Sequence, residues 1–207
     1  MVATTTKLAI GAISIALIFL IGILIYPDLY NISTSYVKTI GVFNLKPIKK
    51  ILEPSLYERL NRMSKQVYQK KDYGINTFWS KHVKEFSKPV FVHNIQDASI
   101  VDEVRANLLR LGIKRPMKNV FMYFWIPGSY IPWHKDAKYT AALTIYLNKF
   151  WKVEYGGLFQ FTTTSNVVET IVPSGNAGVY QEGGVPHSTT IVANNAPVRR
   201  TLQVFFH

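Results

Sequence analysis

The hydrophobic pattern of the chain changes character at Gly112. Between residues 54 and 112, apolar side chains recur at intervals of three and four, which is the period of an amphipathic helix. From residue 113 onward, apolar residues occur in short runs that are rich in β-branched and aromatic types. Gly, Pro and Asn separate these runs, as in strands joined by turns. The order of the two patterns predicts an α+β domain in which helices precede a β-rich core.

Two helices are predicted before Gly112. The first begins near Pro54, because proline suits a first helical turn. The second begins near Asp97 or Ser99, either of which could cap it, and Gly112 is suited to end it. The first apolar stripe consists of Leu56, Leu60, Met63 and Val67. The second consists of Ile100, Val104, Leu108 and Leu111. Both stripes are interpreted as packing faces.

Several short segments after Gly112 are predicted strands. They are residues 119–127, 139–148, 157–161, 167–173, 178–181, 188–193 and 200–206. A series of short strands after two supporting helices favours two sheets packed face to face, the jelly roll or double-stranded β-helix. The predicted domain spans residues 53–207, with its helices in 53–112 and its jelly-roll core in 113–207.

The first 26 residues are much more apolar than the rest. Leu8–Tyr26 is a run of 19 residues without a charged side chain, and about 20 such residues span a bilayer as a helix. A secretory signal is the alternative, but its apolar region is usually shorter and no small-x-small cleavage site follows here. We therefore predict a single-pass transmembrane anchor in residues 1–26 and a juxtamembrane linker in residues 27–52. The flanking positive charges are nearly balanced, which leaves the side of the membrane open.

The net charge of +12 lies mainly in the first part of the chain. Residues 1–88 carry +8 and residues 89–207 carry +4. Two interpretations of the basic segment after the anchor stay open: attraction to anionic lipid headgroups, and a solvated surface that keeps the domain soluble. Nucleic-acid binding is disfavoured, because no stripe of interleaved basic and aromatic residues occurs. The absence of cysteine rules out a disulfide scaffold and favours a reducing compartment.

A candidate metal site begins with the sequence "HKD", which separates His134 from Asp136 by one residue. Alternate residues of a strand face the same way, so both side chains could grip one cation. Of the five histidines, His187 is the best third ligand, because it follows the turn-rich "QEGGVP" and begins a predicted strand. His93 is interpreted as a partly buried, hydrogen-bonded residue. Two histidines and one carboxylate on one side of a metal suit non-haem Fe(II) and oxygen chemistry.

The segment from Phe121 to Phe206 resembles the Fe(II)- and 2-oxoglutarate-dependent dioxygenases, in particular the prolyl 4-hydroxylase-like branch. The matching stretches are "PGSYIPWHKD", "IYLNKFW" followed by "GGLFQF", "IVPSGNAGVY", "VPHSTTIV" and "RRTLQVFF". The resemblance implies a jelly-roll core that uses Fe(II), 2-oxoglutarate and O2, with ascorbate in support. It assigns His134, Asp136 and His187 to the iron-binding, catalytic triad.

The resemblance also implies a basic residue on the last strand that holds the far carboxylate of 2-oxoglutarate. Arg199 and Arg200 compete for this role. Strand alternation places Arg200 on the apolar face of that strand and Arg199 on the opposite face. Alignment with the family on the following strand also favours Arg200, which is therefore the predicted anchor.

Two tyrosines are further candidates for the cosubstrate pocket. Tyr146, in "IYLN", matches a tyrosine that hydrogen-bonds the same carboxylate in related prolyl hydroxylases, and an ordinary strand aromatic is the alternative interpretation. Tyr123 is the weaker candidate. Ile126 stands where relatives often place a tyrosine before "PG", so the near wall of the pocket departs from the family pattern.

The activity implied by the resemblance is hydroxylation of an unactivated C–H bond, with release of succinate and CO2. A prolyl residue of a peptide or protein is the expected substrate. A small molecule stays open, and a nucleic acid is disfavoured because no base-gripping lid precedes the metal strand. The alternative from another class is a membrane-tethered barrel that binds a partner without turnover. Against it, the chain keeps both the acidic metal ligand and a basic residue for the cosubstrate. No feature of the sequence indicates an oligomeric state.

Overall fold

A computed structural model describes most of the chain from residue 45 onward. The described residues are 45–77, 79, 85, 87–136, 138–163 and 167–207. The predicted anchor lies outside these ranges and stays a prediction. Among the helices of the described part, none combines the length and the apolar character that a membrane crossing requires.

Two antiparallel sheets form the core of the described residues. The larger sheet has the strand order β1-β9-β6-β11-β4-β3-β2. Its strands are β1 (Leu45–Ile48), β2 (Gly74–Ile75), β3 (Val90–Asn94), β4 (Met117–Trp125), β6 (Ala141–Tyr146), β9 (Gly178–Glu182) and β11 (Arg199–Phe206). The smaller sheet has the order β5-β10-β7-β8. Its strands are β5 (Ile131–His134), β7 (Phe159–Thr162), β8 (Val168–Ile171) and β10 (His187–Thr189).

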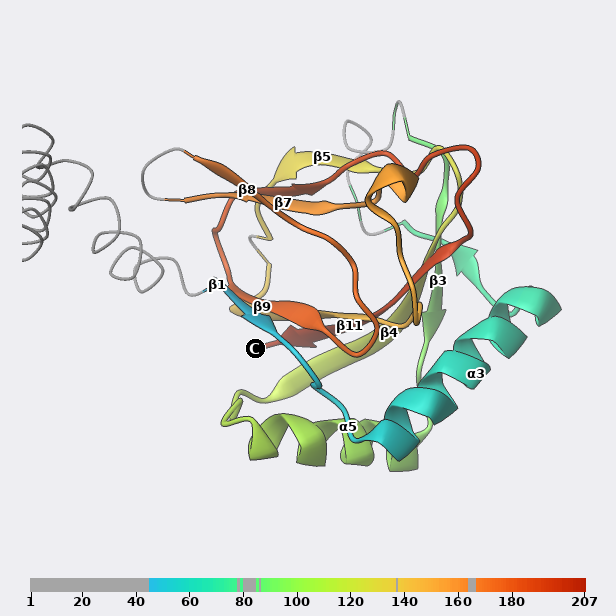
Figure 1. The fold of residues 1–207 in the computed structure, drawn as a ribbon. Helices are drawn as coiled ribbons and strands as arrows, with labels where there is room; N and C mark the ends of the chain where they lie inside the picture. Colours follow the sequence, from blue (N-terminus) through green and yellow to red (C-terminus); the bar gives the residue numbers. More distant parts are fainter. Residues whose placement is uncertain (1–44, 78, 80–84, 86, 137, 164–166) are drawn as a thin grey trace, which may run out of the picture. The chain divides into compact units, whose positions relative to one another are not determined.

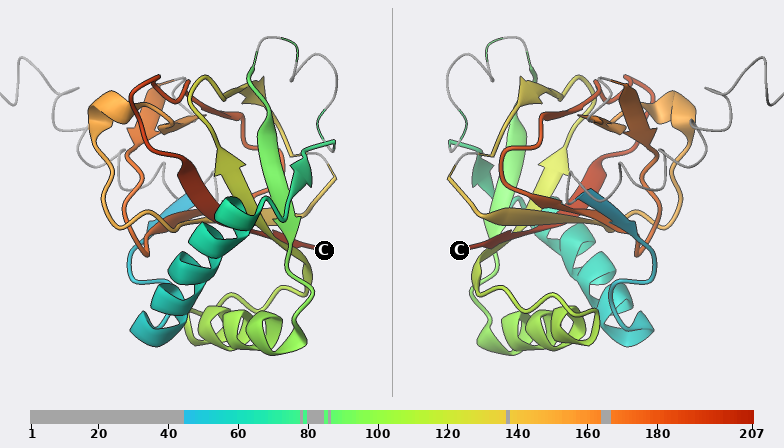
Figure 2. Two further views of the ribbon diagram at one scale, coloured as in Figure 1. Left: turned by 90° about the vertical axis from the view of Figure 1, so that its right-hand side faces the viewer. Right: turned by 90° about the vertical axis from the view of Figure 1, so that its left-hand side faces the viewer.

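The two sheets face each other, and both helices lie on the far side of the larger sheet (Figure 1). The helices are α3 (Pro54–Lys70) and α5 (Ala98–Arg110), and a short 3-10 turn, η1, spans Val153–Tyr155. Figure 2 shows the same order of layers from two other sides. The arrangement is a jelly-roll-like core with supporting helices, as the sequence pattern predicts.

Each predicted strand has a counterpart in the structure, although several ends shift by one to four residues. Four strands have no counterpart among the predictions: β1, β2, β3 and β5. The most instructive is β1, which lies in the predicted linker and pairs with β9 in antiparallel register from Leu45 to Ile48. Residues 45–48, which the sequence assigns to the linker, therefore form part of the larger sheet.

The helices are close to their predicted positions, and their apolar stripes bury against the larger sheet. Leu60 and Val104 are fully buried in one cluster with residues of β4, β6 and β11. Leu111 departs from the prediction: it follows the last residue of α5 and is 37% exposed. Asp97 is the N-cap of α5, and its carboxylate accepts hydrogen bonds from the backbone N–H groups of Ser99 and Ile100.

Replacing Asp97 by alanine is expected to lower the urea midpoint of unfolding at neutral pH, because two N–H groups of the first turn of α5 lose their acceptor. The hydrogen bonds from Ser99 lower the pKa of Asp97. The stabilisation is therefore complete above the ordinary aspartate pKa of about 3.9 and is lost as the pH falls through the lower folded value. The midpoints of the two proteins should converge in acid.

The control is Asp102→Ala on the same helix, where an exposed pair with Arg105 is lost and a smaller change is expected. Equal midpoints of Asp97→Ala and wild type at neutral pH would contradict the cap.

The central strand β11 separates the two layers of the core. Leu202, Val204 and Phe206 pack in the cluster that includes the helices. The alternate residues of β11 turn toward the smaller sheet, and three of them line one pocket between the sheets: Arg199, Gln203 and Phe205. This division decides which side chains of β11 can take part in chemistry.

Candidate active site

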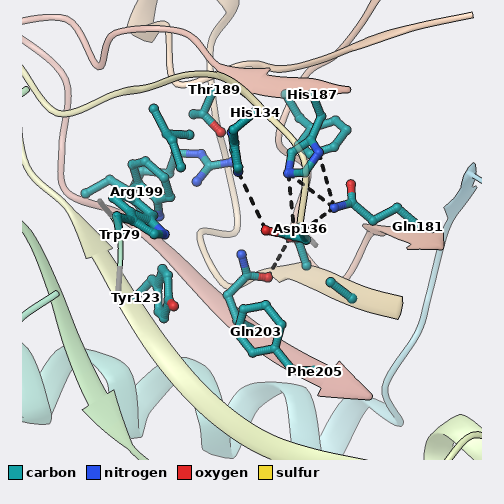
Figure 3. A pocket seen from close by; sticks show the side chains of 15 residues that line it. Trp79, Tyr123, His134, Asp136, Gln181, His187, Thr189, Arg199, Gln203 and Phe205 are labelled. Carbon is teal, nitrogen blue, oxygen red and sulfur yellow. Dashed lines mark hydrogen bonds and ion pairs between the residues drawn. The ribbon is translucent and has the colours of Figure 1, made fainter. Parts of the chain in front are cut away.

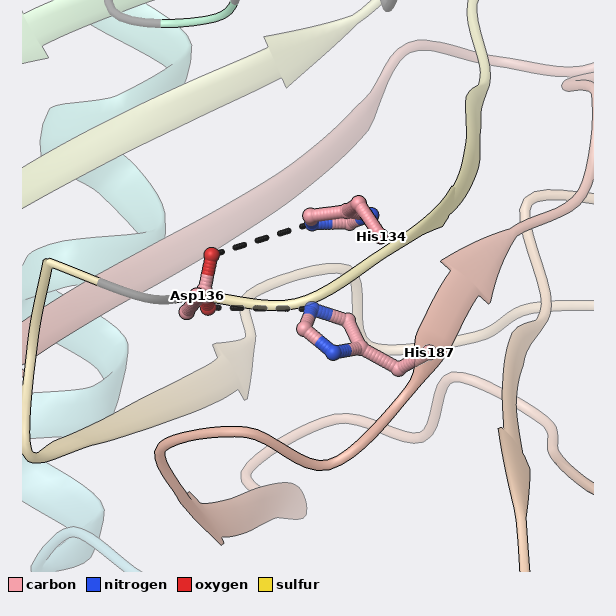
Figure 4. Close-up of side chains that lie close together, drawn as sticks. All are labelled: His134, Asp136 and His187. Atoms are coloured by element: carbon pink, nitrogen blue, oxygen red, sulfur yellow. Dashed lines mark ion pairs between the residues drawn. The ribbon is translucent and has the colours of Figure 1, made fainter.

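Three potential metal ligands converge between the two sheets (Figure 4). The Nε2 atom of His134 lies 3.7 Å from Asp136 Oδ1, and the Nε2 atom of His187 lies 3.6 Å from Asp136 Oδ2. One ligand atom from each residue can be chosen so that all three lie within 4.8 Å of one another. The two imidazole ring centres are 4.2 Å apart. Three groups this close could bind a common ion.

The pairing of β5 with β10 explains why the triad forms. These strands are antiparallel neighbours, and His187 at the start of β10 lies directly opposite His134 at the end of β5. Asp136 lies just beyond the end of β5. The prediction that these three residues meet is confirmed, but the prediction that His134 and Asp136 alternate within one strand is wrong, because the chain leaves the sheet between them.

Hydrogen bonds orient both imidazoles for metal binding. His134 Nδ1 lies 2.8 Å from the carbonyl oxygen of Pro132, and His187 Nδ1 lies 2.8 Å from that of Val185. A carbonyl oxygen only accepts, so Nδ1 carries the proton in each ring and the Nε2 lone pair remains for a metal. Burial lowers the pKa of His187, which favours the neutral form that a metal ligand needs. Two imidazole nitrogens and one carboxylate are the donor set of non-haem Fe(II) oxygenases.

His93 lies apart from the triad, as predicted. Its Nδ1 atom is 2.7 Å from the carbonyl oxygen of Asp72 and 3.5 Å from the Asp72 carboxylate. A hydrogen bond to Asp72, just after the end of α3, therefore holds the ring of His93.

Gln181 is a residue of the site that sequence reasoning missed. It lies on β9, and its amide Nε2 is 3.1 Å from Asp136 Oδ2 and 3.2 Å from His187 Nε2. The side chain is 5% exposed. An amide donor at this distance orients the carboxylate ligand. The available signal in the sequence was a glutamine in a short apolar strand, where a polar side chain has to find partners.

The pocket around the triad is polar at its centre and aromatic along one wall (Figure 3). Gln181, Gln203 and Thr144 contribute polar groups, and the hydroxyl of Thr144 donates to Gln203 Oε1 at 2.6 Å. The aromatic wall consists of Trp79, Tyr123, Trp125 and Phe205. Such a lining can hold a small polar ligand at the metal while limiting the access of water.

Arg199 is the only cation that lines this pocket among the described residues, and it is 1% exposed. Its guanidinium carbon lies 5.1 Å from the ring centre of Trp125 and 5.3 Å from that of Tyr146. No carboxylate of the described part of the chain forms an ion pair with it. Burial lowers the pKa of Arg199, yet a guanidinium keeps its proton in proteins. A buried positive charge without an acidic partner fits an anionic ligand.

Arg200, the predicted anchor of 2-oxoglutarate, does not line the pocket around the triad. Its side chain lies on the helix side of β11 and donates to Asn61 Oδ1 at 3.0 Å and to Ser64 Oγ at 2.7 Å. The strand phase was assigned correctly, since Arg200 shares a face with Leu202. The error lay in taking the apolar face as the pocket face, whereas helices α3 and α5 cover it.

Both candidate tyrosines lie near Arg199 or the triad. Tyr146 is 1% exposed and packs against Arg199. Burial raises the pKa of Tyr146 to about 12, so its hydroxyl is a neutral hydrogen-bond donor. Tyr123 lines the pocket, and burial raises its pKa as well. Ile126, which departs from the family pattern, directly follows the last residue of β4. That last residue is Trp125, whose ring contacts the guanidinium of Arg199.

Comparison with protein-family models and with curated protein sequences found no match. Solved structures do match. The match to a prolyl-4-hydroxylase from Pseudomonas putida has a TM-score of 0.66 and a sequence identity of 16%. It covers 84% of this chain and 98% of the hydroxylase chain. The match to a Trichoplax adhaerens prolyl hydroxylase, in complex with a peptide fragment of hypoxia inducible factor, has a TM-score of 0.64 and a sequence identity of 16%. It covers 85% of this chain and 89% of the hydroxylase chain.

A structure outside the prolyl hydroxylases is also similar. The match to the epimerase SnoN, in complex with Fe3+, alpha ketoglutarate and nogalamycin RO, has a TM-score of 0.61 and a sequence identity of 10%. It covers 82% of this chain and 80% of the SnoN chain. The predicted resemblance is thus confirmed for the fold and for the triad. The chain has the fold of the 2-oxoglutarate- and Fe(II)-dependent oxygenases and carries a His-Asp-His triad in its pocket.

Proposed function

We propose that this protein is an Fe(II)- and 2-oxoglutarate-dependent dioxygenase. The observation that carries the proposal is the presence, in one pocket, of a three-ligand metal site and a buried arginine without an acidic partner. A metal site alone does not identify the function, because proteins of many classes contain one. The added arginine provides the binding group that a dicarboxylic keto acid requires at its far end.

The triad would hold Fe(II) through the Nε2 atoms of His134 and His187 and a carboxylate oxygen of Asp136. The bound iron supplies the activation of O2, in a reaction that converts 2-oxoglutarate, O2 and R–H to succinate, CO2 and R–OH. The backbone carbonyl groups that accept from the two Nδ1–H groups keep the rings oriented. Gln181 holds Asp136 in place.

Arg199 and Tyr146 are proposed to bind the far carboxylate of 2-oxoglutarate. The guanidinium can form two parallel charge-assisted hydrogen bonds with a carboxylate. The neutral hydroxyl of Tyr146 adds a donor beside it. This assignment replaces the sequence-based preference for Arg200. Ascorbate, which the family resemblance implies, would act only as a supporting reductant.

The proposed substrate is a prolyl residue in a peptide or protein. Two of the similar structures are prolyl hydroxylases, and one of them holds a peptide fragment. Three residues of the aromatic wall, Trp79, Tyr123 and Phe205, offer flat apolar surfaces beside the triad, which suit a pyrrolidine ring. A small-molecule substrate is the second candidate, supported by the similarity to SnoN. The N-terminal segment is proposed to tether the enzyme to a membrane, with anionic lipid as a further contact.

The direct test incubates the purified protein with Fe(II), 2-oxoglutarate, ascorbate and a set of proline-containing peptides, followed by mass spectrometry. We expect the mass of one oxygen atom on a proline of at least one peptide, together with one succinate per hydroxylation. Decarboxylation without peptide oxidation would favour a small molecule. If the protein neither binds nor decarboxylates 2-oxoglutarate, the non-catalytic barrel becomes the better description.

Replacing Gln181 by leucine is expected to weaken Fe(II) binding about 10- to 100-fold, because Asp136 loses its orienting donor while all three ligands remain. The measurement is competition of the protein with a chelator for Fe(II) under anaerobic conditions. Gln160→Leu is the matched control. Gln160 lies on β7, where its hydrogen bonds go to Thr170 and Ser188, and its replacement should leave the affinity unchanged. Equal affinities of the Gln181 variant and wild type would contradict the orienting role.

A further inference from the structure

Trp125 is one of the aromatic residues that line the pocket around the triad. Trp125 is the last residue of β4 and is 2% exposed. It pairs with Arg199 across the sheet, where the two residues lie in direct register. Both side chains line the same pocket.

The indole of Trp125 offers a polar atom that nothing in the described part of the chain satisfies. Its Nε1 atom is buried and has no hydrogen-bond partner there. The indole N–H is a donor only, so its partner has to be an acceptor. A buried donor without a partner is unfavourable, and a bound acceptor would remove that penalty.

The same ring holds the guanidinium of Arg199. The guanidinium carbon is 5.1 Å from the ring centre of Trp125 and 5.3 Å from that of Tyr146, so it lies within cation–π range of both rings. The ring of Trp79 packs against the ring of Trp125, and their centroids are 5.4 Å apart. Trp125 therefore has little freedom to move, and it limits the freedom of Arg199.

We propose that Trp125 positions the cosubstrate in this protein: its indole N–H donates a hydrogen bond to the far carboxylate of 2-oxoglutarate, and its ring holds Arg199 in place for the same carboxylate. This inference rests on the proposed function and goes beyond it by assigning a residue.

The test measures ligand binding rather than turnover. The full chain is loaded with Mn(II) under anaerobic conditions, and the Kd of 2-oxoglutarate is determined by calorimetry. Trp125→Phe keeps an aromatic ring against Arg199 but removes the N–H, so we expect a Kd raised about 10-fold or more. Trp125→Leu removes the ring as well and should raise the Kd further. Trp151→Phe is the matched control, since its Nε1–H donates to Gly156 outside this pocket.

A second ligand separates a contact with the far carboxylate from general damage to the pocket. 2-Oxobutyrate has the same keto acid end but lacks the far carboxylate. Its Kd should change less than about twofold in Trp125→Phe. Equal losses of affinity for both ligands, or an unchanged Kd for 2-oxoglutarate, would overturn the role of Trp125. If the wild-type chain binds Mn(II) but no 2-oxoglutarate, the proposed function itself fails.

The unmodified protein provides an independent measurement should the Trp125 variants fold poorly. The chain contains four tryptophans, so a protein labelled with ¹⁵N-tryptophan and loaded with Zn(II) gives few indole N–H signals. Phe variants of the other three tryptophans assign the signal of Trp125. We expect this signal to shift downfield with 2-oxoglutarate and to stay in place with 2-oxobutyrate. The absence of a selective shift would overturn the hydrogen bond.

Discussion

Replacing Asp136 or His187 by alanine is expected to reduce Fe(II)-dependent decarboxylation of 2-oxoglutarate by well over 100-fold. Each change removes one of the three proposed protein ligands, and weaker disturbances around a metal already cost 10- to 100-fold. The assay follows the release of succinate from 2-oxoglutarate by the purified protein. Metal content measured after dialysis should fall in parallel.

The matched control for these ligands is His93→Ala. His93 is also partly buried and hydrogen-bonded, but its partner is Asp72 and it lies outside the triad. Its replacement should retain activity. Activity that survives in both Asp136→Ala and His187→Ala would reject the triad as the metal site.

The second large effect is expected at Arg199. In Arg199→Ala the pocket loses its only cation among the described residues, so the KM for 2-oxoglutarate should rise by about 100-fold or more. A buried, bidentate hydrogen bond between charged groups justifies a change of this size. Steady-state kinetics with varied 2-oxoglutarate at saturating Fe(II) provide the measurement.

Arg200→Ala is the natural comparison, because the two arginines are neighbours on one strand. Its side chain joins β11 to α3 through Asn61 and Ser64. We therefore expect a loss of about 1–2 kcal/mol in the free energy of unfolding and a KM for 2-oxoglutarate close to that of wild type. A larger KM effect at Arg200 than at Arg199 would mean that the pocket lies on the other face of β11.

Local patterns were sufficient for the elements that depend on neighbours in sequence. The helix stripes containing Leu60 and Val104 and the cap at Asp97 follow from spacing along a single helix, and each is confirmed. The strands after Gly112, apart from β5, follow from composition and turn residues. β1 was missed, because "LKPI" contains a lysine and a proline and becomes a strand only by pairing with β9.

The candidate site residues also fall into two groups: those that the sequence pattern predicts and those that only the tertiary structure identifies. The sequence by itself determined the triad, since "HKD" and a later histidine have a recognisable chemistry and order. It also determined that Arg199 and Arg200 face opposite ways, because the period of a strand is two residues. Only the tertiary structure decided that Arg199 faces the pocket, and that Gln181 and Trp125 join it. The physical reason is that alternation defines two faces without identifying them: helices bury one face of β11, and the smaller sheet closes over the other.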